Sequence, residues 1–155
     1  LKPVSSLAQN VELIGVYDNW TAYSFVEKAG KVCYIASIPQ IDEGNYTRRG
    51  DIFAIITHRP AEKSFDVLSI VAGYPYKTGS QAEIRIGSDK FNLFTHEDTA
   101  WAKNTATDDM IVKAMIKGVR MVVKGVSSRG TETTDTYSLL GFTNAREAIN
   151  KACGR

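Results

Sequence analysis

The sequence predicts a mainly β protein, an antiparallel β-sandwich or barrel-like fold with about eight or nine strands and two short helices. Short apolar or alternating runs recur along the chain, and turn-forming residues separate them roughly every 8 to 12 positions. Apolar residues adopt helical spacing only after Trp101. With 155 residues, of which 43% are hydrophobic and 23% charged, the chain has the size and composition of one domain. We expect that domain at residues 11–155, after a leader remnant or flexible tail at residues 1–10.

About nine runs have the composition of β-strands, because their residues alternate between apolar and polar or are continuously apolar. Pro39 and Pro60 follow two of these runs, and proline cannot donate a hydrogen bond to a sheet. Residues 40–45 are polar and include Gly44, so we expect a loop there. The predicted strands are residues 11–16, 20–26, 31–38, 52–57, 65–72, 81–86, 90–95, 119–126 and 133–140.

Two pairs of these strands are predicted to form hairpins. Residues 81–86 and 90–95 alternate on either side of Gly87-Ser88-Asp89, a sequence typical of a tight reversal. Residues 119–126 and 133–140 flank the turn Ser127-Ser128-Arg129-Gly130. The second hairpin lies between the two predicted helices, so we expect it to join them to the core.

The two helices are predicted from caps and spacing. Thr107 is the expected N-cap of the first helix, followed by acidic residues that complement the positive helix end, and Gly118 can close it. Thr143 is the expected cap of the second helix. In that helix Ala145 and Ile149 share one face with Cys153 beside it, so the cysteine can point inward.

Composition also bears on the class of partner and on the compartment. The net charge is +2 and Arg48-Arg49 is the longest basic run, which is too little for a nucleic-acid interface. No apolar run approaches the roughly 20 residues of a membrane-spanning helix. Ser6-Leu7-Ala8 has the form of a signal-peptidase site, which allows export without establishing it.

The two cysteines have two possible interpretations. Cys33 lies in a predicted strand and Cys153 near the C-terminus, a separation that does not fit a redox pair or a zinc knuckle. They can be two unrelated thiols, one buried and one exposed. Alternatively they form a disulfide that holds the C-terminal helix against the body, which an oxidising compartment would favour.

Residue patterns for catalysis are scarce. His58 and His96 are the only histidines, and the adjacent residues His96, Glu97 and Asp98 cannot readily face one metal ion. The sequence has no G-x-S-x-G elbow and no glycine-rich phosphate loop. We therefore expect no catalytic residues, no metal and no cofactor, and a protein that is not an enzyme.

Loop residues of the types enriched at interfaces are the candidate binding site. Tyr74, Tyr76 and Lys77 share one turn, and Arg129 lies at the tip of the second hairpin. The alternative is that both tyrosines pack over a sheet end and Arg129 is only solvated.

Several segments resemble the invasion-associated locus B family over roughly residues 17–153. The most specific are Gly73-Tyr74-Pro75-Tyr76-Lys77 and Ser127-Ser128-Arg129-Gly130-Thr131. Other similar segments are Val71-Ala72, Thr78-Gly79-Ser80, Phe91–Trp101 and Asp135-Thr136-Tyr137-Ser138-Leu139, with Trp20, Cys33-Tyr34-Ile35 and Ala152-Cys153 in matching order.

The resemblance implies an exported alphaproteobacterial protein, periplasmic, secreted or associated with the outer membrane. Founding members of the family are linked to entry into host cells, and the family has no established catalytic residues. With export implied, we expect a Cys33–Cys153 disulfide and a non-enzymatic protein that binds an unidentified envelope or host-surface protein. The alternative is a small-ligand carrier or an unrecognised hydrolase, with a pocket between the sheets that holds His58 or His96 near a carboxylate.

Overall fold

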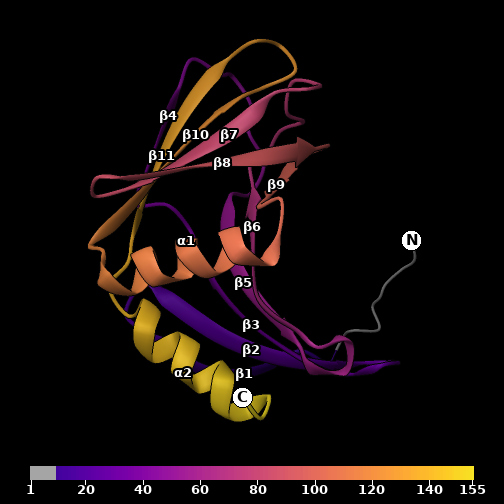
Figure 1. The fold of residues 1–155 in the computed structure, drawn as a ribbon. Helices are drawn as coiled ribbons and strands as arrows, with labels where there is room; N and C mark the ends of the chain where they lie inside the picture. The colour runs from indigo at the N-terminus through magenta and orange to yellow at the C-terminus, as the bar shows by residue number, and fades with distance from the viewer. Residues whose placement is uncertain (1–9) are drawn as a thin grey trace.

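The computed structural model describes residues 10–155, so the possible signal-peptidase site Ser6-Leu7-Ala8 lies outside the described residues. The described part contains eleven strands and two α-helices (Figure 1). The helices are α1 (Thr105–Lys117) and α2 (Phe142–Ala152). The strands are β1 (Glu12–Tyr17), β2 (Trp20–Glu27), β3 (Gly30–Ser37), β4 (Ile41–Gly44), β5 (Phe53–Arg59), β6 (Ser64–Val71), β7 (Gln81–Ile86), β8 (Asp89–His96), β9 (Thr99–Trp101), β10 (Arg120–Val126) and β11 (Glu132–Ser138).

All eleven strands belong to one open antiparallel sheet, in the order β1-β2-β3-β5-β6-β9-β8-β7-β10-β11-β4. The prediction of a mainly β, antiparallel fold with two helices is confirmed, but the prediction of a sandwich or barrel is wrong. The physical reason is β9, whose three residues pair with β6 on one side and with β8 on the other. This short strand makes a single sheet of what would otherwise be two.

The sheet bends strongly, and Figure 1 shows the half containing β7, β8, β10 and β11 crossing over the half containing β1, β2, β3 and β5. The inward residues of both halves form one hydrophobic core. Trp20 of β2 joins the halves, because its indole Nε1 donates to the Ser138 carbonyl oxygen at 2.9 Å and its ring meets Phe142 edge-on at 5.1 Å. The two halves therefore pack on a shared set of side chains. The edge strands β1 and β4 each pair on one side only, so the sheet stays open.

Both predicted hairpins are present. β7 and β8 pair from Gln81↔Phe94 to Ile86↔Asp89, and β10 and β11 pair from Arg120↔Ser138 to Val126↔Glu132. Two strands were not predicted. β9 is very short, and β4 lies in the segment expected to be a loop, where its four residues are all exposed. β4 pairs with β11 and forms one edge of the sheet.

Helix α1 begins earlier than expected. Asn104 is its N-cap, and the side-chain oxygen of Asn104 accepts from the Thr107 backbone N–H at 2.9 Å. Thr107 thus lies inside the first turn instead of capping it, because Asn104, three residues earlier, accepts from the Thr107 N–H and takes the capping role. Gly118 ends the helix as expected.

Helix α2 also starts before its predicted cap. Its N-cap is Gly141 and not Thr143, and Gly141 has a left-handed φ of 92°. A Cβ at this position would lie 1.8 Å from the Tyr17 carbonyl oxygen, so only glycine fits here. The inward face of α2 carries Phe142, Ala145 and Ile149.

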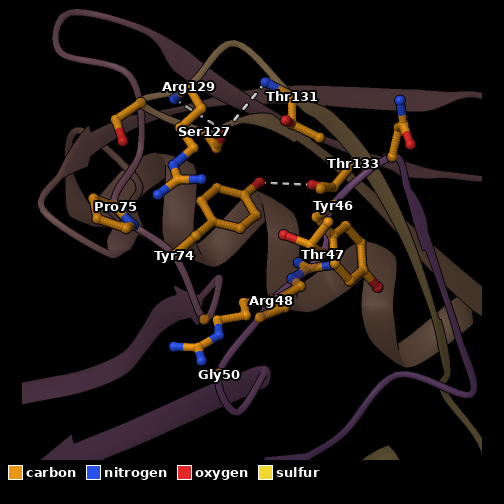
Figure 2. Close-up of a pocket in the computed structure, with 14 residues that line it drawn as sticks. Tyr46, Thr47, Arg48, Gly50, Tyr74, Pro75, Ser127, Arg129, Thr131 and Thr133 are labelled. Atoms are coloured by element: carbon orange, nitrogen blue, oxygen red, sulfur yellow. Dashed lines mark hydrogen bonds between the residues drawn. The ribbon is translucent and has the colours of Figure 1, made fainter.

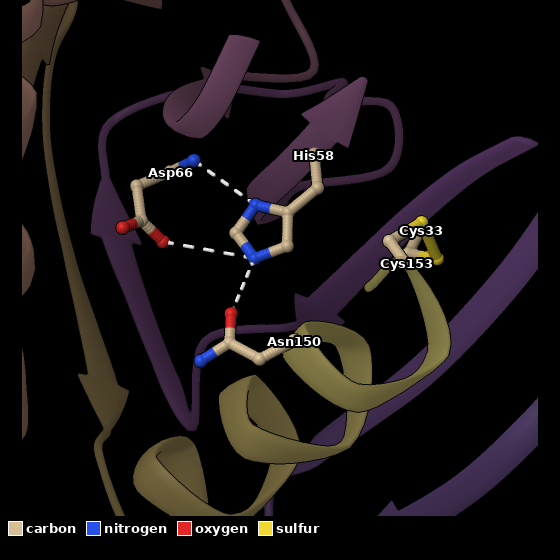
Figure 3. The surroundings of a disulfide bond; sticks show 5 residues. All are labelled: Cys33, His58, Asp66, Asn150 and Cys153. Carbon is tan, nitrogen blue, oxygen red and sulfur yellow. Dashed lines mark hydrogen bonds and ion pairs between the residues drawn. A yellow bond between two sulfur atoms is a disulfide. The ribbon is translucent and has the colours of Figure 1, made fainter. Parts of the chain in front are cut away.

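The disulfide between Cys33 and Cys153 is present, with an S–S distance of 2.03 Å (Figure 3). It joins β3 to the residue that follows α2 across 120 positions of sequence. The expected inward orientation of Cys153 is therefore confirmed.

Candidate functional site

A pocket of about 800 Å³ opens beside the β10–β11 turn, and we call it the hairpin pocket (Figure 2). Three segments that are distant in sequence supply its walls: the loop after β4, the turn after β6, and the turn and first residues of β11. The lining residues are Asn45, Tyr46, Thr47, Arg48, Arg49, Gly50, Gly73, Tyr74, Pro75, Ser127, Ser128, Arg129, Thr131 and Thr133.

Two glycines bring the first two segments together. The Gly50 N–H donates to the Gly73 carbonyl oxygen at 2.8 Å. Gly73 has a φ of 79°, and a Cβ there would lie 2.5 Å from the Gly50 carbonyl oxygen. The close approach and the left-handed backbone both require glycine at position 73.

The hairpin turn is fixed by its own hydroxyl. The Ser127 Oγ accepts from the backbone N–H groups of Arg129 and Thr131, at 3.2 and 3.1 Å. The Ser128 N–H donates to the Pro75 carbonyl oxygen at 2.8 Å, which ties this turn to the second segment. Ser127 is thus a structural residue of the turn, and Arg129 extends from an ordered backbone.

An arginine–carboxylate pair lies beneath the pocket. The two terminal nitrogens of Arg49 contact the two oxygens of Asp135 at 2.8 and 2.6 Å, and both side chains are 3% exposed. The Arg49 Nε donates to the Ala72 carbonyl oxygen at 2.8 Å. Burial by itself lowers the pKa of Arg49, but the hydrogen bonds to Asp135 outweigh it and the net shift is upward. Burial raises the pKa of Asp135, and Arg49 counteracts that rise.

Aromatic rings enclose this arginine. The Arg49 guanidinium carbon lies 5.2 Å from the Tyr46 ring centroid and 5.0 Å from the Tyr74 ring centroid. The hydroxyls of Tyr74 and Thr133 are 2.6 Å apart, so they share a hydrogen bond across the pocket (Figure 2). Burial raises the pKa of the Tyr74 hydroxyl. Arg49 therefore positions both rings and joins the loop after β4 to β11.

The four predicted binding residues are divided by the structure. Tyr74 and Arg129 line the hairpin pocket. Tyr76 is 5% exposed and belongs to the hydrophobic core, where burial raises the pKa of its hydroxyl. Lys77 is exposed but does not line the pocket. The two rings contact each other edge-on, with centroids 5.4 Å apart, so Tyr76 packs in the core beside Tyr74 and only Tyr74 lines the cavity.

The sequence interpretation missed the loop after β4 as part of this site. Arg48-Arg49 was noted only as a basic pair, and nothing in the sequence indicates that Arg49 is buried while Arg48 is exposed. Asp135 lies 86 residues from Arg49 and sits on an inward position of β11. An acidic residue at an inward strand position was the one available signal of a buried partner.

Neither histidine lies in the hairpin pocket. His58 is fully buried, and its Nδ1 accepts from the Asp66 backbone N–H at 3.0 Å while its Nε2 lies 2.7 Å from the Asn150 Oδ1 (Figure 3). This arrangement corresponds to a neutral ring that donates from Nε2, and burial lowers the pKa of His58. His96 lies at a hollow with Phe94 and Trp101, and that hollow has no acidic lining residue.

The acidic neighbour of His58 is Asp66, whose Oδ1 lies 3.9 Å from the His58 Nε2, and two arginines pair with it at shorter distances (Figure 3). The Asp66 carboxylate accepts from the Arg146 Nε and Nη2 at 2.9 and 2.8 Å, and from the Arg155 Nη1 at 3.2 Å. Burial alone would raise the pKa of Asp66, but Arg146 outweighs it and the net shift is downward. These contacts fasten α2 and the C-terminal residue to β6, beside the disulfide.

No three His, Cys, Asp or Glu side chains within residues 10–155 are grouped so that they could hold a metal ion. Within the same residues, neither helix has the length and apolar character needed to cross a membrane.

Comparisons with known proteins place this architecture in a family. No curated protein matches the chain. One solved structure is similar, described as the crystal structure of invasion associated protein b from Bartonella henselae. The TM-score is 0.62 at 13% identity, over 90% of this chain and 97% of that one, so this likeness concerns the fold. The sequence model of the family "Invasion associated locus B (IalB) protein" matches residues 20–150. The chain therefore belongs to the invasion associated locus B family.

Proposed function

We propose that the chain is an exported, non-enzymatic binding protein of the bacterial envelope, which recognises a partner through the hairpin pocket and contributes to host-cell invasion. The hairpin pocket is the observation that carries this proposal. It is large enough for a specific site, and its lining includes half-exposed aromatic residues and exposed arginines, the residue types that are enriched where binding energy concentrates.

The contacts beneath the pocket support a binding role because they preorganise it. The Arg49–Asp135 pair, the Gly50–Gly73 approach and the Ser128–Pro75 hydrogen bond each join two of its three segments. A partner that binds such a surface spends little free energy on ordering loops.

The disulfide supports export, since such bonds persist in oxidising compartments. We place the protein in the periplasm, at the outer membrane or outside the cell of an alphaproteobacterium. The partner we propose is an unidentified envelope or host-surface protein, in line with the description of the family as invasion associated.

The test blocks the pocket without changing its charge. Ser128 lines the pocket and is exposed, so Ser128→Trp should fill the cavity while the turn keeps its backbone contacts. Ser88→Trp places the same ring on the exposed β7–β8 turn and serves as the matched control. Binding of the labelled, purified chain to host cells and to isolated envelopes would be measured by flow cytometry and sedimentation.

We expect Ser128→Trp to weaken binding by about tenfold or more, because the added ring would block the contacts at the centre of the interface. Ser88→Trp should bind as the unmodified chain does. Equal binding of both folded variants would contradict the use of this pocket.

A small-ligand carrier is the second candidate, because about 800 Å³ lies within the range of small-molecule sites. A carrier would retain a small molecule through purification, and native mass spectrometry would show the added mass.

A further inference from the structure

We infer that the hairpin pocket recognises an acidic carbohydrate, a hydroxyl-rich chain that bears carboxylate, sulfate or phosphate groups. This inference rests on the proposed binding function of the pocket and names the chemistry of the group bound there. It follows from the charge of the lining, from the arrangement of its two exposed arginines and from the nature of the remaining side chains.

The charge of the lining is uncompensated. Arg48 and Arg129 line the pocket and are exposed, and within residues 10–155 neither makes an ion pair. The third arginine, Arg49, is neutralised by Asp135. No acidic side chain lines the cavity. Two positive charges around one concave site create a potential that attracts anions and disfavours cations.

Asp51 and Asp98 line an adjoining hollow and not this pocket, and within residues 10–155 no acidic residue makes an ion pair with Arg48 or Arg129. Asp42 accepts a hydrogen bond from the Tyr46 hydroxyl at the rim. Glu132 is exposed on β11, where strand alternation turns it away from the side that carries Thr133.

The two arginines come from different walls. Arg48 belongs to the loop after β4, whereas Arg129 belongs to the hairpin turn and reaches toward Tyr74 and Pro75 (Figure 2). A guanidinium group matches carboxylate, sulfate and phosphate oxygens through paired hydrogen bonds. Two such groups across one cavity fit a chain that carries anionic groups at intervals better than they fit one isolated ion.

The rest of the lining favours a carbohydrate over a protein segment or an acyl chain. Pro75 is the only lining residue with an aliphatic side chain. Most others end in hydroxyl or amide groups, which exchange hydrogen bonds with sugar hydroxyls, and the half-exposed rings of Tyr46 and Tyr74 offer flat surfaces for the C–H faces of sugars. The apolar anchors of a protein segment would meet few aliphatic side chains in this lining, whereas a carbohydrate attached to an envelope or host-surface protein would meet hydroxyl and amide groups.

The experiment measures affinity by isothermal titration calorimetry with four probes. A sulfated heparin hexasaccharide represents a host-surface source, and a phosphorylated core oligosaccharide from a Gram-negative lipopolysaccharide represents an envelope source. Neutral maltohexaose and a poly-glutamate peptide of matched charge are the comparisons. The variants are Arg48→Gln and Arg129→Gln, with Lys77→Gln as the control that removes one nearby charge outside the pocket.

We expect one or both acidic oligosaccharides to bind more tightly than maltohexaose and poly-glutamate, and the tighter of the two to identify the source. Each arginine variant should weaken that binding about tenfold or more, as expected for a lost hydrogen bond between charged groups. Lys77→Gln should change it less than about twofold, as expected for a charge outside the contact.

Two results would overturn the inference. Poly-glutamate binding as tightly as the acidic oligosaccharides, with the same dependence on Arg48 and Arg129, would make the ligand an acidic protein. Binding to none of the four probes, while Ser128→Trp still abolishes attachment to cells or envelopes, would remove the carbohydrate and leave the proposed binding function standing.

Discussion

Arg49 and Asp135 illustrate how charged residues can act as part of the protein interior. The pair sits beneath the hairpin pocket, nearly inaccessible, with every Arg49 nitrogen engaged by Asp135 or the Ala72 carbonyl oxygen. Desolvation makes such a pair costly to form and more costly to break, because removal of one partner leaves a buried charge alone. Its structural role is to hold the loop after β4 against β11.

The contribution of this pair to stability can be tested by comparing a variant that removes one partner with a variant that removes both. Arg49→Met should lower the free energy of unfolding by about 3–5 kcal/mol, the usual cost of stranding a buried charge. The double variant Arg49→Met/Asp135→Leu should be more stable than Arg49→Met alone, since it removes the stranded carboxylate. Urea denaturation monitored by circular dichroism would measure both.

Arg48→Met is the matched control for this experiment, because Arg48 is the exposed neighbour of Arg49. Arg48→Met should change the free energy of unfolding by no more than about 0.5 kcal/mol, as for most surface substitutions. If the loss of stability in Arg49→Met/Asp135→Leu equals the sum of the losses in Arg49→Met and in Asp135→Leu alone, the two residues are not a coupled pair.

Asp108 is a further buried acid, and within residues 10–155 it makes no ion pair with a cation. Its Oδ1 accepts from the Leu68 backbone N–H at 3.1 Å, where helix α1 packs on β6. Burial raises its pKa from 3.8 to about 6. The folded protein therefore retains this proton at a pH where the unfolded chain has already lost it, and stability from this group falls as pH rises from about 4 to 6.

Asp108→Asn should remove this pH dependence and keep the hydrogen bond to Leu68. The gain in unfolding free energy over the unmodified chain should grow between pH 4 and pH 7, by about 2–3 kcal/mol for a shift of this size. The difference between the two proteins is the quantity to measure, because His58 has a lowered pKa and contributes with the opposite sign near this range.

Thermal unfolding at several pH values would supply these data, with Asp109→Asn as the control at an exposed neighbouring position. A constant difference between Asp108→Asn and the unmodified chain at all pH values would contradict the proton retained by Asp108.

At the scale of the residue, the sequence indicated candidate binding residues only where the residue type and its place in a turn were enough to suggest them. Tyr74 and Arg129, which line the hairpin pocket, were predicted as binding residues because they are an aromatic residue and an arginine in turns. Arg49 and Asp135 were not found, since charged residues usually lie in solvent and their contact joins segments 86 positions apart. Tyr76 and Tyr74 are equivalent in sequence, and only the path of the backbone turns one of them into the core.

At the scale of the element, the hairpins were predictable because alternation and turn residues act over short distances. β4 and β9 were not, and for different reasons. β4 has no buried residue, so no apolar pattern marks it, and its strand conformation depends on hydrogen bonds to β11. β9 has three residues, too few for a period to be recognised.

The first residues of the two helices were also not predicted correctly, because they depend on contacts with distant parts of the chain. Asn104 and Thr107 are both good capping residues, and the choice between them depends on where the chain leaves β9. Gly141 begins α2 in a left-handed conformation, and Tyr17, more than a hundred positions earlier in the sequence, leaves no room for a Cβ there.

Helix α2 depends on a covalent link that can be removed selectively. Cys153→Ser should lower the free energy of unfolding by up to about 4–5 kcal/mol, the chain-entropy value for a loop of this length. Reductant should produce a similar loss in the unmodified chain and none in the variant. Differential scanning calorimetry with and without reductant would measure this, and two reactive thiols in oxidised native protein would contradict the disulfide.

Cys153 is the informative position for this change because Cys33 is fully buried. A serine at position 33 would place a hydroxyl in the core and add a second cost. The contacts of Asp66 with Arg146 and Arg155 should keep α2 in place after reduction, so we expect a less stable protein that is still folded.

At the scale of the whole molecule, the sequence predicted the class of fold but not its closure. Strand composition is similar in sandwiches, barrels and bent open sheets, and the difference here lies in the hydrogen bonds of β9 to both β6 and β8. The likeness to the Bartonella henselae protein at 13% identity shows that very different sequences reach this arrangement.

The path of the chain through the sheet has a consequence for the order of events during synthesis. β4 is made early but pairs only with β11, and Cys33 has no disulfide partner until Cys153 is made. A nascent chain that ends after β9 therefore holds an unmatched strand and an unmatched thiol, and it lacks α2 as a cover for β2 and β3. The pairing of β4, the disulfide and this cover can form only after β11, α2 and Cys153 have been made. Completion of the sheet and of its covalent link is thus timed by the segment from β11 to Cys153.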